Sequence, residues 1–298
     1  MTNKKTIIIT GALGQNGKIL SKILIDNGYK VYGFINNNKQ LKVKNVVYKK
    51  INLKNFKKIK KILIEINANH IVHFGSNNPS YGDKDYFYKE NYITTKNIID
   101  AIIELNCKIN FIFPNSSQIF KKKNIVTEKD AFKITNSYTK FRIKIFKYMQ
   151  NLKKKKNFKY CNLILFNHDS AYRRKTFLLP KLISYVKKND LHSLNKIYKN
   201  NIIADFSHAY DICNAIYLII KKNICLEKLI LSSGKKTRIN TIINYLLTKY
   251  TSNKKIKILT KKNNNYIIGN NKLAKKILKW KIKKNIYLAA DEMMKTYE

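Results

Sequence analysis

Residues 6–34 hold the feature that most constrains the fold, a short apolar run followed by three spaced glycines. The run is three consecutive isoleucines at 7–9, which is the pattern of a strand buried on both faces. Gly11, Gly14 and Gly17 follow, and apolar residues then recur at helical spacing before a second apolar run. A strand, a glycine-rich turn, a helix and a second strand together predict a dinucleotide-binding unit.

The reason for the glycines is close approach. Glycine permits a tight turn and lets the backbone come near a pyrophosphate, while the N-terminus of the next helix offers N–H groups and a partial positive charge. We expect this helix to begin at Gly17, and we count Gln15 and Asn16, which precede it, among the binding candidates. An ordinary glycine-containing loop is the alternative, and the strand on each side makes it the minor one.

Strand-like and helical segments continue to alternate along the first half of the chain. Strands are expected at 46–48, 70–75, 109–113 and 162–166, and helices at 56–66, at 92–105 and from 137 onward. This alternation indicates parallel βαβ units, so the predicted fold class is α/β, a Rossmann-like doubly wound parallel sheet. Because ligands bind at the carboxyl ends of such strands, we expect the loops that follow the strands to line one cleft.

The alternation weakens after residue 166. We therefore expect a dinucleotide-binding Rossmann domain at 1–166, to which later segments return, and a smaller mixed lobe for the substrate at 167–298. Segments 228–231, 239–247 and 272–278 are assigned to that lobe.

The net charge of +44 would ordinarily suggest a nucleic-acid partner. However, only four of the 61 basic residues are arginine, and the lysines spread over every predicted helix, with one run at 153–156. A solvated surface explains this pattern better, so no specific nucleic acid is expected. A small anionic ligand would still be attracted to such a field.

Hydrophobic residues make up 44% of the 298 residues, which is typical of a globular chain. No apolar run is long enough to span a bilayer, and the N-terminus leads directly into a strand, so we expect a cytoplasmic protein without a membrane segment. Four cysteines lie singly in apolar surroundings and are expected to be reduced core thiols without a metal: Cys107, Cys161, Cys213 and Cys225.

Two segments carry side chains suited to chemistry on a substrate oxygen. Ser116 and Ser117 follow the fifth predicted strand, where a hydroxyl can hydrogen-bond a substrate hydroxyl or ketone, although a helix-cap role is the alternative. Further on, Tyr138 opens a helix with Arg142 four residues later on the same face. A phenol beside a cation can exchange a proton with a substrate oxygen. The serines precede Tyr138 by about twenty residues, which resembles the arrangement in short-chain dehydrogenases and strengthens this interpretation.

Six segments resemble segments of one family, and they follow each other in the same order as in that family. GALGQNG resembles the GxxGQDG loop of GDP-mannose 4,6-dehydratases, SSQIF resembles TSELY, and NSYTKFR resembles SPYAVAK. Residues 161–177 are similar without a gap to CNGILFNHESPRRGETF, residues 204–215 to RDWGHARDYVEA, and residues 269–281 to GDPTKAKEKLGWK. The chain therefore resembles the GDP-mannose 4,6-dehydratase family of extended short-chain dehydrogenases/reductases.

The resemblance implies an NADP-dependent lyase that removes water from GDP-mannose, or a related nucleotide-sugar, and gives a 4-keto-6-deoxy sugar. It also implies a homo-oligomer. The implied catalytic residues are Ser116, Gln118, Tyr138 and Arg142, and the implied substrate residues are Ser116, Asn167, Thr176 and Lys181. The implied cofactor residues are Gly11, Gly14, Gln15, Asn16, Gly17, Asn36, Asn37, Gly75, Ser76, Tyr138, Arg142, Asn167, His168 and Arg173.

The chain departs from the family pattern at several functional positions. Gln118 replaces the glutamate that abstracts the C5 proton, and an amide cannot act as that base; Glu128 and Asp130 follow in a loop that could fold back. Arg142 replaces a lysine, which keeps the charge without the compact ammonium. A 4-keto-sugar reductase or epimerase, which would not need the glutamate, and a non-catalytic nucleotide-binding relative therefore remain alternatives.

The cofactor choice rests on the end of the second strand. Asn36 and Asn37 stand where the family has the arginine pair that holds the NADP 2′-phosphate. No acidic residue ends this strand, so the usual partner of the NAD ribose is missing as well. NADP is therefore the expected cofactor, with NAD as the alternative.

Overall fold

The computed structural model describes residues 5–36, 42–76, 84–121, 124–156, 158–252, 256, 259–260, 262–263 and 265–297. The chain forms two compact units. The first comprises Met1–Lys121, Ala131–Ile164 and Cys213–Leu229, and the second comprises Lys122–Asp130, Leu165–Ile212 and Ile230–Glu298. The chain therefore crosses between the units several times.

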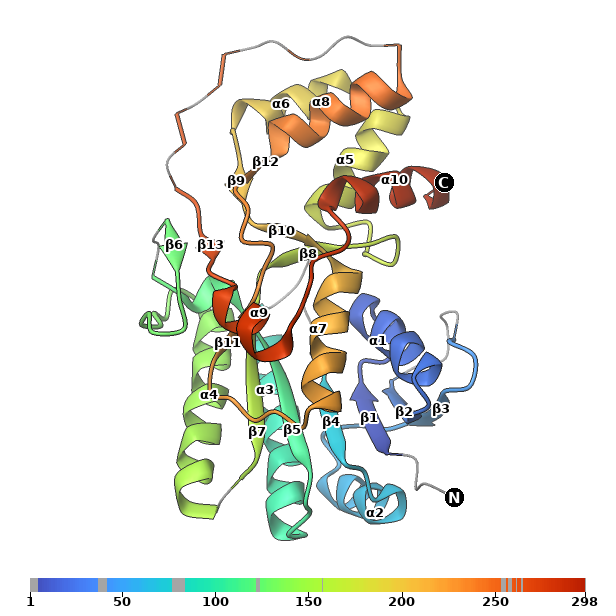
Figure 1. The fold of residues 1–298 in the computed structure, drawn as a ribbon, viewed down its shortest axis with the longest axis vertical. Helices are drawn as coiled ribbons and strands as arrows, with labels where there is room; N and C mark the ends of the chain where they lie inside the picture. Colours follow the sequence, from blue (N-terminus) through green and yellow to red (C-terminus); the bar gives the residue numbers. More distant parts are fainter. Residues whose placement is uncertain are drawn as a thin grey trace. The chain divides into compact units, whose positions relative to one another are not determined.

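A seven-stranded sheet forms the centre of the first unit (Figure 1). Its strand order is β11-β7-β5-β4-β1-β2-β3, and β1 pairs in parallel with both β2 and β4. The strands are β1 (Thr6–Thr10), β2 (Lys30–Ile35), β3 (Val47–Lys50), β4 (His70–His73), β5 (Asn110–Ser116), β7 (Tyr160–Leu165) and β11 (Leu229–Leu231). The order reverses at β1, so the predicted doubly wound Rossmann-like fold is confirmed.

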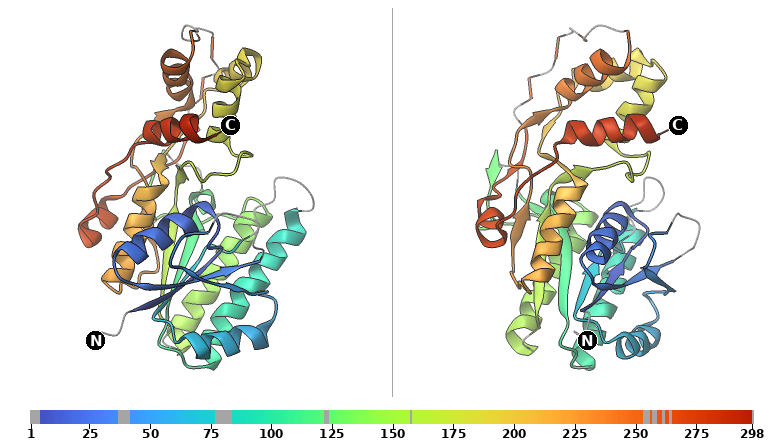
Figure 2. Two further views of the ribbon diagram at one scale, coloured as in Figure 1. Left: turned by 90° about the vertical axis from the view of Figure 1, so that its right-hand side faces the viewer. Right: turned by 45° about the vertical axis from the view of Figure 1, so that its right-hand side comes forward.

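Helices cover both faces of this sheet (Figure 2). They are α1 (Gln15–Asp26), α2 (Phe56–Ile66), α3 (Lys84–Glu104), α4 (Ser137–Lys156) and α7 (Ala209–Lys221). Apolar side chains of α2, α3 and α4 pack in one cluster with Ile8, Ile71, Phe111 and Phe113 of the strands. Successive strand residues point to opposite faces, which is why the neighbours of Ile8 in the isoleucine run are buried on the other side of the sheet.

Helix α2 shows how local sequence sets these elements. Its buried residues are Ile59, Ile62, Leu63 and Ile66, as the helical spacing predicts. The Asn55 side chain accepts a hydrogen bond from the Lys58 N–H at the N-terminus, and Asn67 ends the helix in the left-handed conformation, with φ of 46°. The expected bounds of this helix are therefore confirmed.

The second unit is mixed. Helices α5 (Leu178–Lys187), α6 (Leu191–Lys199), α8 (Ile239–Tyr250) and α10 (Ile286–Thr296) share one apolar core. Three two-stranded pairs complete the unit with α9 (Lys272–Leu278): β8 (Asn167–Asp169) with β10 (Phe206–His208), β9 (Ile203–Ala204) with β12 (Thr237–Arg238), and β6 (Ile125–Val126) with β13 (Ile268–Gly269). Within the described part of the chain, no helix has the length and apolar character needed to cross a bilayer.

Several expectations need correction. Helix α1 begins at Gln15 instead of Gly17, because Gly14 is extended and its carbonyl accepts the Lys18 N–H at 2.9 Å. Residues 229–231 form strand β11 of the main sheet, beside β7, although Ile230 and Leu231 fall in the second unit. Cys225 is exposed and is not a core thiol. The lysine run at 153–156 is the last turn of α4, where cations complement the helix dipole.

Four of the five histidines are buried, and burial lowers the pKa of each imidazole. The pKa falls to about 4 for His70, to about 3 for His73 and to about 4 for His168, and it is lowered for His208. The fifth, His192, is exposed on α6. Because these folded pKa values lie below the unfolded value near 6.5, the unfolded chain binds more protons in mild acid.

We therefore expect the free energy of unfolding to be highest above pH 6.5. It should fall by on the order of a few kcal/mol as the pH drops to 4.5. Urea unfolding at a series of pH values measures this. His70→Leu should flatten the curve, because it removes one imidazole that takes up a proton on unfolding. Leucine is a suitable replacement, since the His70 Nδ1 is buried without a hydrogen-bond partner among the described residues. His192→Leu is the matched exposed control and should leave the slope unchanged. A constant stability between pH 7 and 4.5 would contradict the argument.

Candidate functional site

The turn after β1 is closely packed at its first and third glycines. Gly11 has φ of +65°, and a Cβ there would lie 2.9 Å from the backbone of Phe74 and Gly75. A Cβ on Gly17 would lie 2.5 Å from the Gly11 carbonyl oxygen. Neither position can accept a side chain without a shift of the backbone, so both glycines are required by the fold itself.

Gly14 differs from the other two glycines. It is exposed, has φ of −72°, and a Cβ there would meet only the Gly11 oxygen, at 3.3 Å. It precedes α1 and provides no side-chain cap to that helix. An open position without a Cβ at a helix N-terminus fits a pyrophosphate, because backbone N–H groups and the helix dipole favour an anion there.

The other predicted cofactor residues of the first unit lie around this turn. Gln15 is buried, and its Nε2 donates to the Asn16 Oδ1 at 3.4 Å. Gly75 and Ser76 follow β4, and Gly75 lies beside Gly11. At the end of β2, the Phe34 carbonyl accepts the Gly11 N–H at 3.1 Å. The segments after β1, β2 and β4 therefore meet at one edge of the sheet.

Of the two asparagines predicted to bind the cofactor, the structure describes only Asn36. Asn36 follows β2 and is exposed. Asn37 lies outside the described residues. The cleft expected to include the loop after β7 stays a prediction, because that loop belongs to the second unit.

Ser116 ends β5 and is held by its neighbours. Its N–H donates to the Asn115 Oδ1 at 2.8 Å, and its Oγ accepts the Gln118 N–H at 3.3 Å. The Asn115 Nδ2 donates to the Asn162 Oδ1 of β7 at 3.0 Å, within the buried interior. These bonds fix the turn and leave the Gln118 side chain exposed.

Arg142 links the helix of Tyr138 to the strand of Ser116. Its Nη1 donates to the Pro114 carbonyl of β5, and its guanidinium carbon lies 5.1 Å from the centroid of the Tyr138 ring and 5.3 Å from that of Phe113. Cations are attracted to aromatic faces, so this geometry holds the guanidinium between β5 and α4. Arg142 thus contacts both Tyr138 and the strand that ends at Ser116.

Sequence reasoning missed Tyr88, whose ring contacts Tyr138. The two rings meet edge to face with centroids 5.4 Å apart. Tyr88 lies in α3, fifty positions earlier in the chain. With 20 tyrosines in the sequence, no local pattern could have singled it out.

The carboxylates that follow Gln118 in the sequence serve the fold. The Glu128 Oε1 accepts the Ile230 N–H at 2.9 Å, and the Asp130 Oδ2 accepts the Thr127 N–H at 2.8 Å. Both belong to the second unit, whereas Gln118 belongs to the first. The contacts of Glu128 and Asp130 therefore give no support to either as a substitute base.

Five predicted residues belong to the second unit. The His168 Nδ1–H donates to the Phe166 carbonyl at 2.7 Å, and burial, together with the charge of Arg173, lowers the pKa of the ring to about 4. The Arg173 Nε lies 2.9 Å from the Asp169 Oδ1, and its guanidinium carbon lies 3.6 Å from the centroid of the Phe177 ring. The other three are exposed: Asn167, Thr176 and Lys181.

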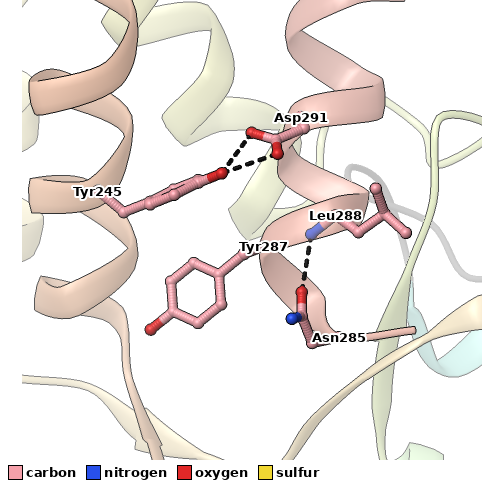
Figure 3. Close-up of a pocket in the computed structure, with 5 residues that line it drawn as sticks. All are labelled: Tyr245, Asn285, Tyr287, Leu288 and Asp291. Carbon is pink, nitrogen blue, oxygen red and sulfur yellow. Dashed lines mark hydrogen bonds between the residues drawn. The ribbon is translucent and has the colours of Figure 1, made fainter. Parts of the chain in front are cut away.

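A cavity of about 490 Å³ lies elsewhere in the second unit, between α8 and α10 (Figure 3). None of the predicted site residues lines it. The lining residues are Tyr245, Asn285, Tyr287, Leu288 and Asp291. The Asp291 carboxylate accepts hydrogen bonds from the Tyr245 and Tyr250 hydroxyls and from the Lys249 ammonium, each within 2.8 Å. With these donors around it, Asp291 joins the two helices.

The fold and the site define a class of protein. A glycine turn between β1 and α1, with a serine at the end of β5 and a tyrosine at the start of the next helix, is the arrangement of the extended short-chain dehydrogenase/reductase class of epimerases and dehydratases. Within this class, the chain belongs to the GDP-mannose 4,6-dehydratase family, whose model matches residues 8–293. This family consists of nucleotide-sugar dehydratases.

Individual relatives agree with this assignment. The chain is 23% identical to GDP-mannose 4,6 dehydratase 2 of Caenorhabditis elegans, over 81% of this chain and 69% of the relative. It is also 23% identical to GDP-mannose 4,6 dehydratase of Dictyostelium discoideum, over 98% of this chain and 95% of the relative.

Solved structures share the fold. UDP-glucose 4-epimerase of Thermotoga maritima has a TM-score of 0.82 and 16% identity, covering 98% of each chain. The dTDP-glucose 4,6-dehydratase of Bacillus anthracis, in complex with NAD, has a TM-score of 0.81 and 16% identity, covering 98% of this chain and 96% of that one. The fold extends over nearly the whole chain in both comparisons.

The glycine turn gives a direct prediction. Gly14→Val should keep the fold and lose at least tenfold in dinucleotide affinity, because the new side chain projects where the pyrophosphate would sit. Gly17→Ala is the contrasting variant: its Cβ meets the backbone of Gly11 and Ala12, so it should lower the melting temperature. Calorimetric titration with NADP⁺ and thermal unfolding separate the two effects. Native affinity in folded Gly14→Val would refute this role.

Proposed function

We propose that this chain is a nucleotide-sugar enzyme that binds a nicotinamide dinucleotide and acts on GDP-mannose or a close relative. The observation that carries the proposal is the match to the dehydratase family across residues 8–293, with Ser116 and Tyr138 retained at the end of β5 and the start of α4. The glycine turn lies in the same unit as these two residues. One unit thus contains both the predicted cofactor turn and the predicted reactive side chains.

The residues of the first unit would act at one sugar oxygen. The Tyr138 phenol exchanges a proton with the O4 of the sugar, and the Ser116 hydroxyl hydrogen-bonds the same oxygen. Arg142 supplies a positive charge beside the Tyr138 ring. The nicotinamide, when bound, supplies the reversible hydride acceptor that such a dehydration needs.

The preferred cofactor in this proposal is NADP, with NAD as the alternative. Asn36, exposed after β2, offers no carboxylate to the ribose hydroxyls, which argues against an NAD-specific site. His168 and Arg173, which belong to the second unit, are proposed as cofactor residues on the family resemblance. Asn167, Thr176 and Lys181 are proposed to bind the substrate, and the family resemblance and their exposure support this.

Gln118 is the position that decides which reaction the chain performs. The amide has no acidic or basic group to remove the C5 proton, so we propose that dehydration is slow in the native chain. This residue favours a second candidate function, reduction or epimerisation of a 4-keto sugar, because that reaction needs no base at this position. A nucleotide-binding relative without catalytic activity is the third possibility. Homo-oligomer formation and a cytoplasmic location stay predictions from the sequence.

Restoring a carboxylate at this position tests the proposal. Gln118→Glu should raise the turnover of GDP-mannose with NADP⁺ by ~10²- to 10⁴-fold, the usual contribution of a general base. The side chain is exposed, so the substitution should not disturb folding. The product, a 4-keto sugar, is measured by mass spectrometry.

Gln118→Ala is the matched control and should leave turnover at the native level. Brisk native turnover that Gln118→Glu does not increase would refute this placement of the base. Inactivity of both proteins, with dinucleotide binding intact, would instead favour the reductase or the non-catalytic candidate.

A further inference from the structure

A buried hydrogen-bond chain runs from the turn after β4 to helix α3. The Gly75 N–H donates to the Thr10 Oγ1 at 2.9 Å, and the same oxygen lies 2.7 Å from the His73 Nδ1. The His73 Nε2 lies 2.9 Å from the Thr95 Oγ1, which donates to the Asn91 carbonyl at 2.6 Å. The side chains of Thr10, His73 and Thr95 are all buried. The function assigned so far makes no use of this chain.

One assignment of protons satisfies every group in this chain. A hydroxyl has one proton; with that of Thr95 donated to the Asn91 carbonyl, the Thr95 oxygen accepts from His73. In this assignment the His73 proton is on Nε2, and Nδ1 accepts from the Thr10 hydroxyl. The Thr10 oxygen then has lone pairs available for the Gly75 N–H.

The surroundings of His73 keep the ring in this state. Burial, together with the charge of Arg142, lowers the pKa of His73 to about 3, so the imidazole is neutral at physiological pH. The rings of Phe111 and Phe113 flank it at centroid distances of 5.9 and 6.3 Å. The imidazole is thus neutral and packed beside both rings.

Resting on the proposed dinucleotide site, we infer that His73 is a positioning residue, which orients the Thr10 hydroxyl to hold Gly75 against the Gly11 turn. The packing supports this role. A Cβ on Gly75 would lie 2.8 Å from the Thr10 Oγ1, and one on Gly11 would lie 2.9 Å from the Gly75 nitrogen. The Gly11 turn and the segment at Gly75, which would contact the cofactor, are therefore tightly packed against each other. The Thr10 hydroxyl forms the hydrogen bond between them.

Removing the hydroxyl of Thr10 tests the inference. Thr10→Val keeps the shape of the side chain but leaves the Gly75 N–H and the His73 Nδ1 unpaired. We expect the Gly75 amide to exchange with solvent roughly tenfold faster, and the dissociation constant for NADP⁺ to rise by a similar factor. Thr10→Ser, which retains a hydroxyl, should restore slow exchange and tight binding. Exchange and the imidazole tautomer are measured by NMR, and binding by calorimetry.

The control removes a buried hydroxyl from outside the chain. The Ser21 Oγ of α1 is buried without a hydrogen-bond partner among the described residues, so Ser21→Ala should change neither quantity. Thr95→Val removes the acceptor of the His73 Nε2–H and should shift the ring away from the Nε2–H tautomer of the native protein. A purely structural role for His73 would not require this spectroscopic change.

The outcomes separate this inference from the proposed function. Native exchange at Gly75 in folded Thr10→Val, or an Nδ1–H tautomer in the native protein, would overturn the positioning role. Faster exchange with unchanged NADP⁺ affinity would also overturn it, because the loop would then be irrelevant to the cofactor. If the native protein binds neither NADP⁺ nor NAD⁺, the proposed function fails and the cofactor role of His73 fails with it. The exchange data would still decide whether the hydrogen-bond chain holds the loop.

Discussion

The close contact between the turn after β1 and the segment after β4 is the constraint on which the first unit depends. Gly11 can adopt its positive φ and lie against Phe74 and Gly75 only because it has no Cβ. Gly17 extends the same packing to α1, whose N-terminus is thereby directed toward the sheet edge. The geometry that would receive a pyrophosphate is therefore a consequence of backbone packing.

A second constraint is the position of the Arg142 charge. The guanidinium contacts the faces of Phe113, Phe141 and Tyr138 and donates to the Pro114 carbonyl. A lysine side chain is shorter and presents a compact charge without a planar face. The arginine therefore connects β5 to α4 in a way that the family lysine would not. This contact ties the helix of Tyr138 to the strand of Ser116.

Few acidic residues are present that could replace the base missing at Gln118. The chain has 17 carboxylate side chains against 61 basic ones, and several buried carboxylates accept backbone N–H groups. Asp205 accepts from Ser233, Gly234 and Gly269, and Asp211 accepts from Lys283 and Lys284. Such carboxylates hold the second unit together, because a buried charge must be compensated by hydrogen bonds. A carboxylate that left these hydrogen bonds to act as a catalytic base would destabilise the second unit.

The sequence by itself determined the alternation of strands and helices in the first half of the chain, the glycine turn and the family, because periodicity, turn residues and motif order are local properties of the chain. The inward face of α2 and the start of α4 at Ser137 were predictable for the same reason. Only the tertiary structure decided that β11 joins the main sheet, that Tyr88 contacts Tyr138 and that Thr10, His73 and Thr95 form one hydrogen-bond chain. These contacts join residues far apart in the sequence, and no local pattern encodes which distant side chains will meet.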